Sequence, residues 1–476
     1  MVVNSFETHH GVVYNVKSYG ATGHRLGNAQ NFIQHTVDAC AAAGGGVVYF
    51  PPGAYTTGTI TLHDNLRIFI EAGATIYSSK NPADFPKQHG TSHALFYGAD
   101  LTNITLEGRG TIDGQANYDE RLMEGFQDWY IYPNQLRWEQ AGHPLMRTFP
   151  TANSIGNLVL LVRCNDVRIT GLTFTQSPSW AIHLWGCERL VIDGVYVHSS
   201  IRDGVWSDGI DPDGCRDVRI SNCTIETGDD ALVFYSSNLF GPARPCENIT
   251  VTNCRLTSAS SALKFVDGNL TSIRNVTIDN CLITGSNRGI AIMVFDGGTV
   301  ENVILSNLVI ECKRFDWFWW GNADPLHINL IRRSEIDPNV DKSIERPIGT
   351  IRNILIRNVF ARGFGGCVIH GSAESMLENL TMDNVRLEII ADDNSPLQSS
   401  QAAVLIDNAI NLRLRDFSIN WEIPVAANFR SALTVENVHG LTLDGICAPP
   451  VPNSSAESAI TLTKVSGLEI RNPIKV

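Results

Sequence analysis

The sequence predicts an all-β protein, a single-stranded parallel β-helix with a short N-terminal capping helix. Short segments of alternating apolar and polar residues recur along the chain, each introduced by Asn, Asp or Gly. In the middle of the chain the segments that start at Asn248, Asn275 and Asn302 are 27 residues apart. Periods of this size indicate a solenoid, a propeller or an array. Because each unit holds several short β segments and no helical pattern, the β-helix fits best.

Residues 28–43 are the exception to the β pattern. They carry Ile33, Val37 and Cys40 at helical spacing and are followed by Gly44-Gly45-Gly46, which stops a helix. We expect one short amphipathic helix here, covering an end of the stack, because solenoids need caps. Residues 12–100 would then contain this cap and the first coils.

The repeat continues through residues 101–476, which we expect to be the main coils of one domain spanning residues 1–476. Its segments begin at Asn103, Asp166, Asp217, Asn248, Asn275, Asn302, Asn353, Asn379, Asn411, Gly440 and Gly467. Many units continue into a second small turn that contains Asn, at residues 222, 253, 280, 307, 358 and 384. Stacked at one corner, such side chains can hydrogen-bond to one another along the helix. Cys223, Cys254 and Cys281 each follow such an Asn, which predicts an inward column of packed thiols.

Composition excludes several classes of partner. The 476 residues are 43% apolar and 18% charged, with a formal net charge of −13, which argues against binding to nucleic acid or anionic membranes. No apolar run is long enough to span a bilayer, and no signal peptide is visible at the N-terminus. The protein is therefore expected to be cytoplasmic, or secreted if a leader is missing from this sequence. The 11 cysteines are an odd number with no zinc-site spacing, so we expect no metal or other cofactor.

Three acidic side chains stand out in residues 207–234. Asp208 and Asp229 are 21 residues apart, and Asp230 follows directly. A short β-rich segment, Val218-Arg219-Ile220, lies between them. If this period is one turn of the solenoid, the carboxylates stack on one face of adjacent coils, roughly 4.8 Å apart.

Such convergence has a chemical use. Like charges brought together raise at least one pKa, so one carboxyl holds a proton as general acid while another stays ionised to activate water. Glycoside hydrolysis requires this division of labour. The competing interpretation is that Asp-Gly and Gly-Asp-Asp are turn residues, and we assign only that role to Asp211 and Asp213.

Two long stretches, residues 114–150 and 311–347, break the repeat. Long insertions on a regular scaffold usually build a binding face. Trp129 and Trp320 in these stretches are candidates to stack on sugar rings, although tryptophans there would equally close small cores beneath the loops.

Four motifs together resemble the polygalacturonase family of glycoside hydrolases, family 28. They are GGGVVYFPPGAYTTGTI at 44–60, SPSWAIHLWGCERLVIDGVYV at 177–197, SDGIDPDGC at 207–215 and GDDA at 228–231. The resemblance implies a right-handed β-helix and inverting, single-displacement hydrolysis without a metal. It implies that Asp229 is the general acid and that Asp208 and Asp230 position and deprotonate water. Trp180 and His183 match a segment bordering the substrate groove, although His183 also fits a structural role.

The sequence departs from the family at two places. Ser260-Ser261-Ala262 stands where polygalacturonases carry Gly-His-Gly, and Ala291-Ile292-Met293 stands where they carry Arg-Ile-Lys. The Arg and Lys side chains that usually bind a galacturonate carboxylate are therefore missing. Lys264 and Arg288 are candidate substitutes in substrate binding, although Lys264 also suits a surface charge or a structural ion pair.

The resulting prediction is an inverting glycosidase that cleaves an α-linked glycan, pectin-type or related. The expected partner is an oligosaccharide or polysaccharide. The alternatives are a β-helix lyase, a fructan-cyclising transferase and a non-catalytic carbohydrate-binding β-helix.

Overall fold

The computed structural model describes residues 12–87, 94–116, 156–204, 206–265, 270–315, 321–336, 346–390, 401–423, 425, 429–452 and 458–475. Trp129 and Trp320 lie outside these residues, as does much of the two predicted insertions. The chain divides into two compact units. The first ends at Asp229 and also includes Leu239–Pro242, whereas the second contains Asp230–Asn238 and the residues from Ala243 onward.

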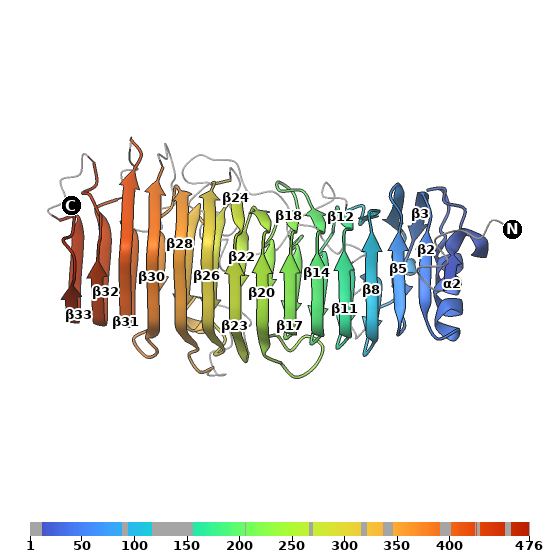
Figure 1. The fold of residues 1–476 in the computed structure, drawn as a ribbon, viewed down its shortest axis with the longest axis horizontal. Coiled ribbons are helices and arrows are strands. Elements are labelled where there is room, and N and C mark those ends of the chain that lie inside the picture. The colour runs from blue at the N-terminus through green and yellow to red at the C-terminus, as the bar shows by residue number, and fades with distance from the viewer. Residues whose placement is uncertain are drawn as a thin grey trace. The chain divides into compact units, whose positions relative to one another are not determined.

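The first unit is a stack of short parallel strands. Each strand pairs in parallel with its equivalent in the next coil, as Val167 of β11 does with Leu190 of β14 (Figure 1). Its strands are β1 (Val13–Asn15), β2 (Gly46–Phe50), β3 (Gly53–Thr57), β4 (Ile60–Thr61), β5 (Leu66–Ile70), β6 (Ala74–Ser78), β7 (Ala94–Ala99), β8 (Thr102–Gly108), β9 (Thr111–Asp113), β10 (Asn157–Val162), β11 (Asn165–Thr170), β12 (Thr173–Thr175), β13 (Ile182–Trp185), β14 (Glu188–Asp193), β15 (Tyr196–His198), β16 (Ile210–Asp213), β17 (Arg216–Ser221) and β18 (Thr224–Thr227).

The second unit has the same architecture with longer strands, such as β26, which pairs along its length with β28. Its elements are β19 (Leu232–Phe234), β20 (Cys246–Thr252), β21 (Arg255–Ser258), β22 (Ser261–Phe265), β23 (Ser272–Asp279), β24 (Leu282–Ser286), β25 (Arg288–Val294), β26 (Thr299–Cys312), β27 (Asp324–Leu330), α4 (Arg333–Ile336), β28 (Thr350–Gly363), β29 (Cys367–His370), β30 (Leu377–Ile389), β31 (Ala402–Trp421), β32 (Ser431–Asp444) and β33 (Ile460–Ile470). The fold is the predicted right-handed parallel β-helix.

The predicted N-terminal helix is α2 (Gln30–Ala42), which buries Ile33, Thr36, Val37 and Cys40. It lies beside β2 at the N-terminal end of the first unit (Figure 1). Gly44 has a φ of 94°, a conformation that ends the helix at low steric cost because glycine has no Cβ. Two 3₁₀ turns complete the helical content of this unit as described, Val16–Tyr19 and Pro82–Asp84.

Amide ladders connect the coils of the second unit. The Asn302 side chain donates to Asn275 at 3.1 Å and accepts from Asn353 at 3.0 Å. A second ladder joins Asn307, Asn358 and Asn384 at 3.0 Å per step. All of these residues have positive φ, between 51° and 57°, which asparagine tolerates better than most side chains. The predicted hydrogen bonding between stacked Asn side chains is confirmed at residues 307, 358 and 384, whereas Asn222 donates to Asp193 and Asn307 to Asp279. The ladder at the starts of the repeat segments was not predicted.

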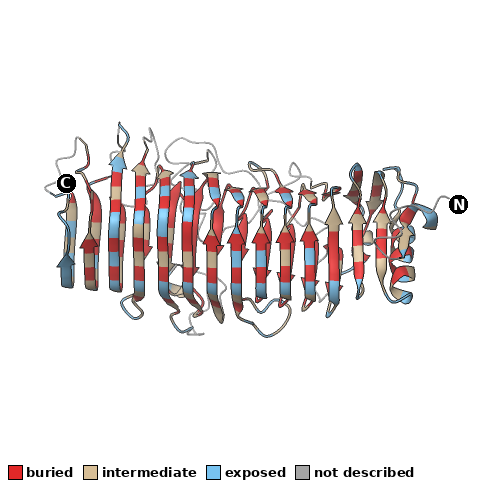
Figure 2. Ribbon diagram, viewed as in Figure 1, coloured by how far each residue is buried: buried red, intermediate tan, exposed pale blue. Residues whose placement is uncertain are grey.

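The interior of each unit is apolar. Buried and exposed residues alternate along the strands (Figure 2), as the period of two requires. Cys223, Cys254 and Cys281 are buried free thiols, in agreement with their predicted inward position. None of the helices among the described residues is long and apolar enough to cross a membrane.

Candidate active site

Asp208 and Asp229 come together in the first unit. Asp208 directly precedes the Gly209-β16 segment, where its backbone carbonyl accepts a bond of 2.9 Å from Ala181 N–H of the adjacent coil. Asp229 follows β18. The two side chains present oxygens within 4.8 Å of each other, and the residues are only 2% and 5% exposed. The spacing of about one coil therefore brings these carboxylates to the same place.

The Asp229 carboxylate is oriented by the chain around it. Its Oδ2 accepts a hydrogen bond of 3.0 Å from the Trp206 backbone N–H, while Thr227 Oγ1 donates to the Asp229 carbonyl at 2.8 Å. A Cβ at Gly228 would lie 2.4 Å from the carbonyl oxygens of Ser200 and Gly204, so this position admits only glycine without a backbone shift. The glycine of the GDDA motif thus lets the segment before Asp208 pack against the turn that carries Asp229.

Asp230 is the next residue in the chain and belongs to the second unit. Its Oδ1 accepts bonds from Ser260 Oγ at 2.7 Å and from the Ser261 backbone N–H at 2.9 Å. Its Oδ2 lies 2.8 Å from Lys264 Nζ, and both side chains of this ion pair are buried. The serine pair that stands in place of the family's Gly-His-Gly therefore helps to hold a carboxylate.

His183 lies on β13 and is buried. Its Nδ1 is 3.2 Å from Asn157 Nδ2, and its Nε2 is 3.4 Å from Asp213 Oδ2. The Trp180 ring meets the imidazole edge-on at 4.6 Å and is half-buried. His183 is thus anchored on both nitrogens, whereas Trp180 keeps part of its ring exposed.

Asp211 and Asp213 are not turn residues. Both lie in β16, where they pair in register with His183 and Trp185 of β13. Only the register of neighbouring coils reveals this, because the DPDG letters by themselves are typical of a turn. Asp213 and Asn157, as the partners of His183, are residues that the sequence analysis missed.

Arg288 is almost wholly buried, at 2% exposed. Its Nε lies 3.8 Å from Asp324 Oδ2 and its Nη1 lies 3.6 Å from Met293 Sδ. Ala291 and Met293, which occupy the place of the family's Arg-Ile-Lys cations, belong to a buried apolar cluster. That cluster also contains Phe295 and Ile331. The side chains that occupy the place of the missing cations are therefore apolar themselves, although Lys264 and His327 pair in register with Ala291 on either side.

Carboxylate oxygens as close as those of Asp208 and Asp229 suit two occupants. A water molecule that hydrogen-bonds to both would bridge them at ordinary distances of about 2.8 Å. A hard divalent cation also prefers such oxygens. Carboxylate-based hydrolysis uses the first arrangement.

Comparison with known protein families gives the family of this chain. The model described as glycosyl hydrolases family 28 matches residues 48–313, more than half of the chain. The chain belongs to this family. The match covers Asp208, Asp229 and Asp230, so the acidic residues lie within the family 28 region.

Curated relatives share only part of their length with this family 28 chain. A probable polygalacturonase from Vitis vinifera is 28% identical over 208 residues, which cover 40% of this chain and 37% of that protein. An exo-poly-alpha-D-galacturonosidase from Dickeya chrysanthemi is 23% identical over 255 residues, covering 47% and 42% respectively. The chain therefore matches less than half the length of these relatives.

Solved structures show the same fold over most of the chain. A hyperthermoactive exopolygalacturonase from Thermotoga maritima has a TM-score of 0.67 at 21% identity, covering 86% of this chain and 92% of that chain. A polygalacturonase from Erwinia carotovora has a TM-score of 0.58 at 19% identity, covering 81% and 94%. At these identities the likeness establishes the β-helix.

Proposed function

We propose that this protein is a glycosidase that hydrolyses an α-linked glycan, pectic or related, by an inverting mechanism. The observation that carries the assignment to a glycosidase is the buried pair Asp208 and Asp229, whose oxygens lie within 4.8 Å of each other in a family 28 chain. The inverting course rests on the family 28 resemblance, since these oxygens are closer than the roughly 6.5–9.5 Å that usually separates acid and base in inverting enzymes. A buried like-charge pair is costly to keep without a use.

In the proposed reaction Asp229 donates its proton to the glycosidic oxygen as the bond between that oxygen and the anomeric carbon breaks. Asp208 and Asp230 orient a water molecule, which attacks the anomeric carbon from the opposite face. One of these two carboxylates accepts the proton that the water loses. The Trp206 backbone N–H donates to Asp229 Oδ2 and so orients this carboxyl.

We propose that the sugar bound where other family members carry the Arg-Ile-Lys cations is uncharged or carries a different substituent. Lys264 faces Asp230, and Arg288 is buried against Asp324. Ala291 and Met293 are apolar and buried. A galacturonate carboxylate placed there would lose water without gaining the bidentate contact that offsets its desolvation.

Release of reducing sugar from a panel of polygalacturonate, rhamnogalacturonan, neutral α-glucans and fructans tests the activity. The panel is run with wild type, Asp229→Asn and the matched control Asp217→Asn, an exposed position with φ of 58° that suits asparagine. We expect cleavage of one glycan, at least 10³-fold slower in Asp229→Asn on the order of general-acid contributions, and unchanged in Asp217→Asn. Equal rates for all three proteins would exclude the assigned role.

The stereochemistry and metal requirement separate the enzyme classes. An inverting hydrolase releases the β-anomer first from an α-linked substrate, which proton NMR detects before mutarotation. Activity should persist in EDTA and give no ultraviolet-absorbing unsaturated product. A lyase would give that product, and a fructan-cyclising transferase would give a cyclic fructose product without net hydrolysis.

The second candidate is a carbohydrate-binding β-helix without turnover. It is favoured by the apolar side chains of Ala291 and Met293 and by the serine pair at Ser260 and Ser261, because these residues replace ones that bind the substrate or assist protonation in the family. It predicts glycan binding by isothermal titration that is unchanged in Asp229→Asn, with no product from any member of the panel.

A further inference from the structure

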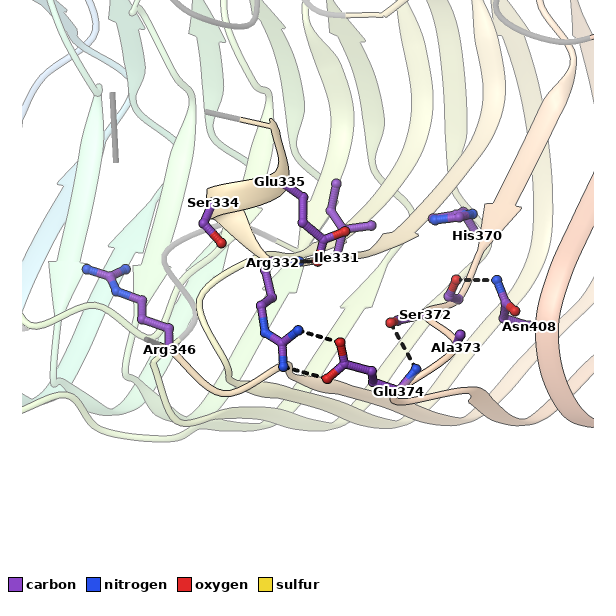
Figure 3. A pocket seen from close by; sticks show the side chains of 11 residues that line it. Ile331, Arg332, Ser334, Glu335, Arg346, His370, Ser372, Ala373, Glu374 and Asn408 are labelled. Atoms are coloured by element: carbon purple, nitrogen blue, oxygen red, sulfur yellow. Dashed lines mark hydrogen bonds and ion pairs between the residues drawn. The ribbon is translucent and has the colours of Figure 1, made fainter. Parts of the chain in front are cut away.

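A pocket of about 620 Å³ opens in the second unit, beside the ends of β27 and β29 (Figure 3). Its wall is formed by Ile331 and Arg332, by residues of α4, by the turn after His370 and by Asn408 of β31. The volume lies within the range of roughly 300–1,000 Å³ that is usual for small-molecule sites. None of the carboxylates assigned to hydrolysis lines it.

Ion pairs fix the walls of this pocket. The Arg332 guanidinium meets the Glu374 carboxylate in two parallel bonds of 2.6 Å, which Figure 3 shows on one side of the space. Arg346 and Arg333 both bond to Asp296, a carboxylate that is only 1% exposed. Bidentate pairs of this kind set direction as well as distance, so the polar groups are positioned before any ligand arrives.

His370 is positioned in the same way. Its Nδ1 lies 2.8 Å from an oxygen of Asp407, and the hydrogen bond with this carboxylate raises the pKa of His370. Asn408 donates to the same Asp407 at 2.8 Å and to the Gly371 carbonyl at 2.9 Å. A Cβ at Gly371 would lie 2.2 Å from the Asn408 carbonyl oxygen, so this close approach requires glycine. The imidazole is thereby held at the pocket wall.

The charges of the lining nearly cancel. The guanidinium groups of Arg332 and Arg346 are already matched by carboxylates, so an anion would compete with Glu374 and Asp296 for them. The remaining carboxylate, Glu335, accepts a bond from the Arg332 backbone N–H and interacts electrostatically with His370, so a cation would compete with these groups for it. The site therefore favours an uncharged ligand that both donates and accepts hydrogen bonds.

Hydroxyl groups complete the lining. Ser334 and Ser372 both border the pocket, and Ser372 Oγ accepts a bond of 3.2 Å from the Glu374 N–H, which leaves its own proton for a ligand. Glu335 accepts a bond of 3.2 Å from the Arg332 N–H. The apolar side chains among the lining residues are only Ile331 and Ala373. A ligand rich in hydroxyl groups matches this pattern, whereas an apolar ligand does not.

We propose that this pocket is a second carbohydrate site, which binds a neutral sugar residue of a glycan through the paired arginines, the serine hydroxyls and His370. The choice of a glycan as ligand rests on the proposed function. The pocket holds a part of the substrate, or of a related chain, that the hydrolytic carboxylates do not touch.

Binding is tested on the full chain carrying Asp229→Asn, in which turnover is expected to be at least 10³-fold slower. The probes are neutral and galacturonate oligosaccharides of equal length. The readout is the imidazole NMR signal of His370, assigned as the signal that is absent in His370→Gln. We expect a neutral oligosaccharide to shift this signal, with affinity at least tenfold weaker in Ala373→Trp, which fills the pocket from an exposed position. Ala72→Trp, at an exposed alanine in the first unit, is the matched control and should bind as the parent does.

Three outcomes would overturn the proposal. They are a His370 signal that no saccharide shifts, equal affinity in Ala373→Trp and the parent, and tighter binding of the galacturonate probe than of the neutral one. Hydrolysis by the protein with Asp229 intact is measured separately. Loss of the shift with hydrolysis retained would refute the pocket alone, and a shift without hydrolysis would refute the glycosidase alone.

Discussion

The ammonium group of Lys264 lies 2.8 Å from a carboxylate oxygen of Asp230, and neither side chain is more than 8% exposed. From the sequence, this lysine could either bind substrate or form a structural ion pair. The observed ion pair explains how the carboxylate of Asp230, the residue after Asp229, can be buried. It also shows that this cation is already engaged before a substrate arrives.

Lys264→Met should destabilise the fold by about 3–5 kcal/mol, because it leaves a buried carboxylate without its partner. Chemical denaturation followed by circular dichroism measures the change. Lys313→Met, at an exposed lysine, is the matched control and should change stability by about 0.5 kcal/mol or less. The double variant Lys264→Met/Asp230→Asn should recover part of the loss. Equal stability of the two lysine variants would contradict a buried ion pair.

Asn302→Ala should cost about 2 kcal/mol. The substitution removes the bonds to Asn275 and Asn353 and places a Cβ with alanine's preferences at a φ of 56°. Asn302→Gly keeps the backbone freedom and should recover about 1 kcal/mol of the loss. Denaturant unfolding of the three proteins measures both terms. If the two variants were equally stable, the positive φ would contribute nothing.

His327 should make the fold sensitive to acid. The pKa of His327 is lowered well below its ordinary 6.5, mainly by burial and further by the positive charges of Arg288 and His370. Below pH 6.5 the unfolded chain binds a proton that the folded chain does not, so stability falls as the pH falls. The slope reaches at most about 1.4 kcal/mol per pH unit for this group. Unfolding of wild type and His327→Gln between pH 7.5 and 5 should show a smaller decline in the variant, and parallel declines would exclude His327 as the source.

Thiol labelling should be confined to one cysteine. Ten of the 11 cysteines are buried and free, whereas Cys447 is partly exposed. Burial raises the pKa of Cys40 to about 11 and that of Cys367 to about 12, which further suppresses the reactive thiolate. Mass spectrometry after brief iodoacetamide treatment should find one label in the native protein and 11 after unfolding. Cys447→Ser should abolish the native label, and rapid labelling of several sites would contradict the buried thiol columns.

The parallel β-helix could be predicted because its signals are local and repeated. Each coil needs a residue that tolerates positive φ at the same corner, so asparagine recurs at positions such as 275 and 302. The alternation of apolar side chains then follows from the strand period of two. The helix at residues 30–42 was equally accessible, because its apolar spacing and terminal glycines are contiguous.

The site could be predicted only where one coil separates its members. Asp208 and Asp229 meet because their spacing is about one turn. Asp213 and His183 were missed as partners, because their contact depends on the register between β13 and β16. The burial of Arg288 against Asp324 was equally hidden, since nothing in the letters around an arginine says which face of a strand carries it.

The asparagine ladder has a consequence for protein engineering. From Asn275 to Asn302 the chain takes 27 residues to complete a step, and from Asn302 to Asn353 it takes 51, yet the amide bond closes at 3.1 and 3.0 Å. Coil length and coil register are therefore independent. A foreign recognition loop inserted between β26 and β27, or between β27 and β28, should leave the scaffold aligned, so binding specificity can be changed without redesigning the core.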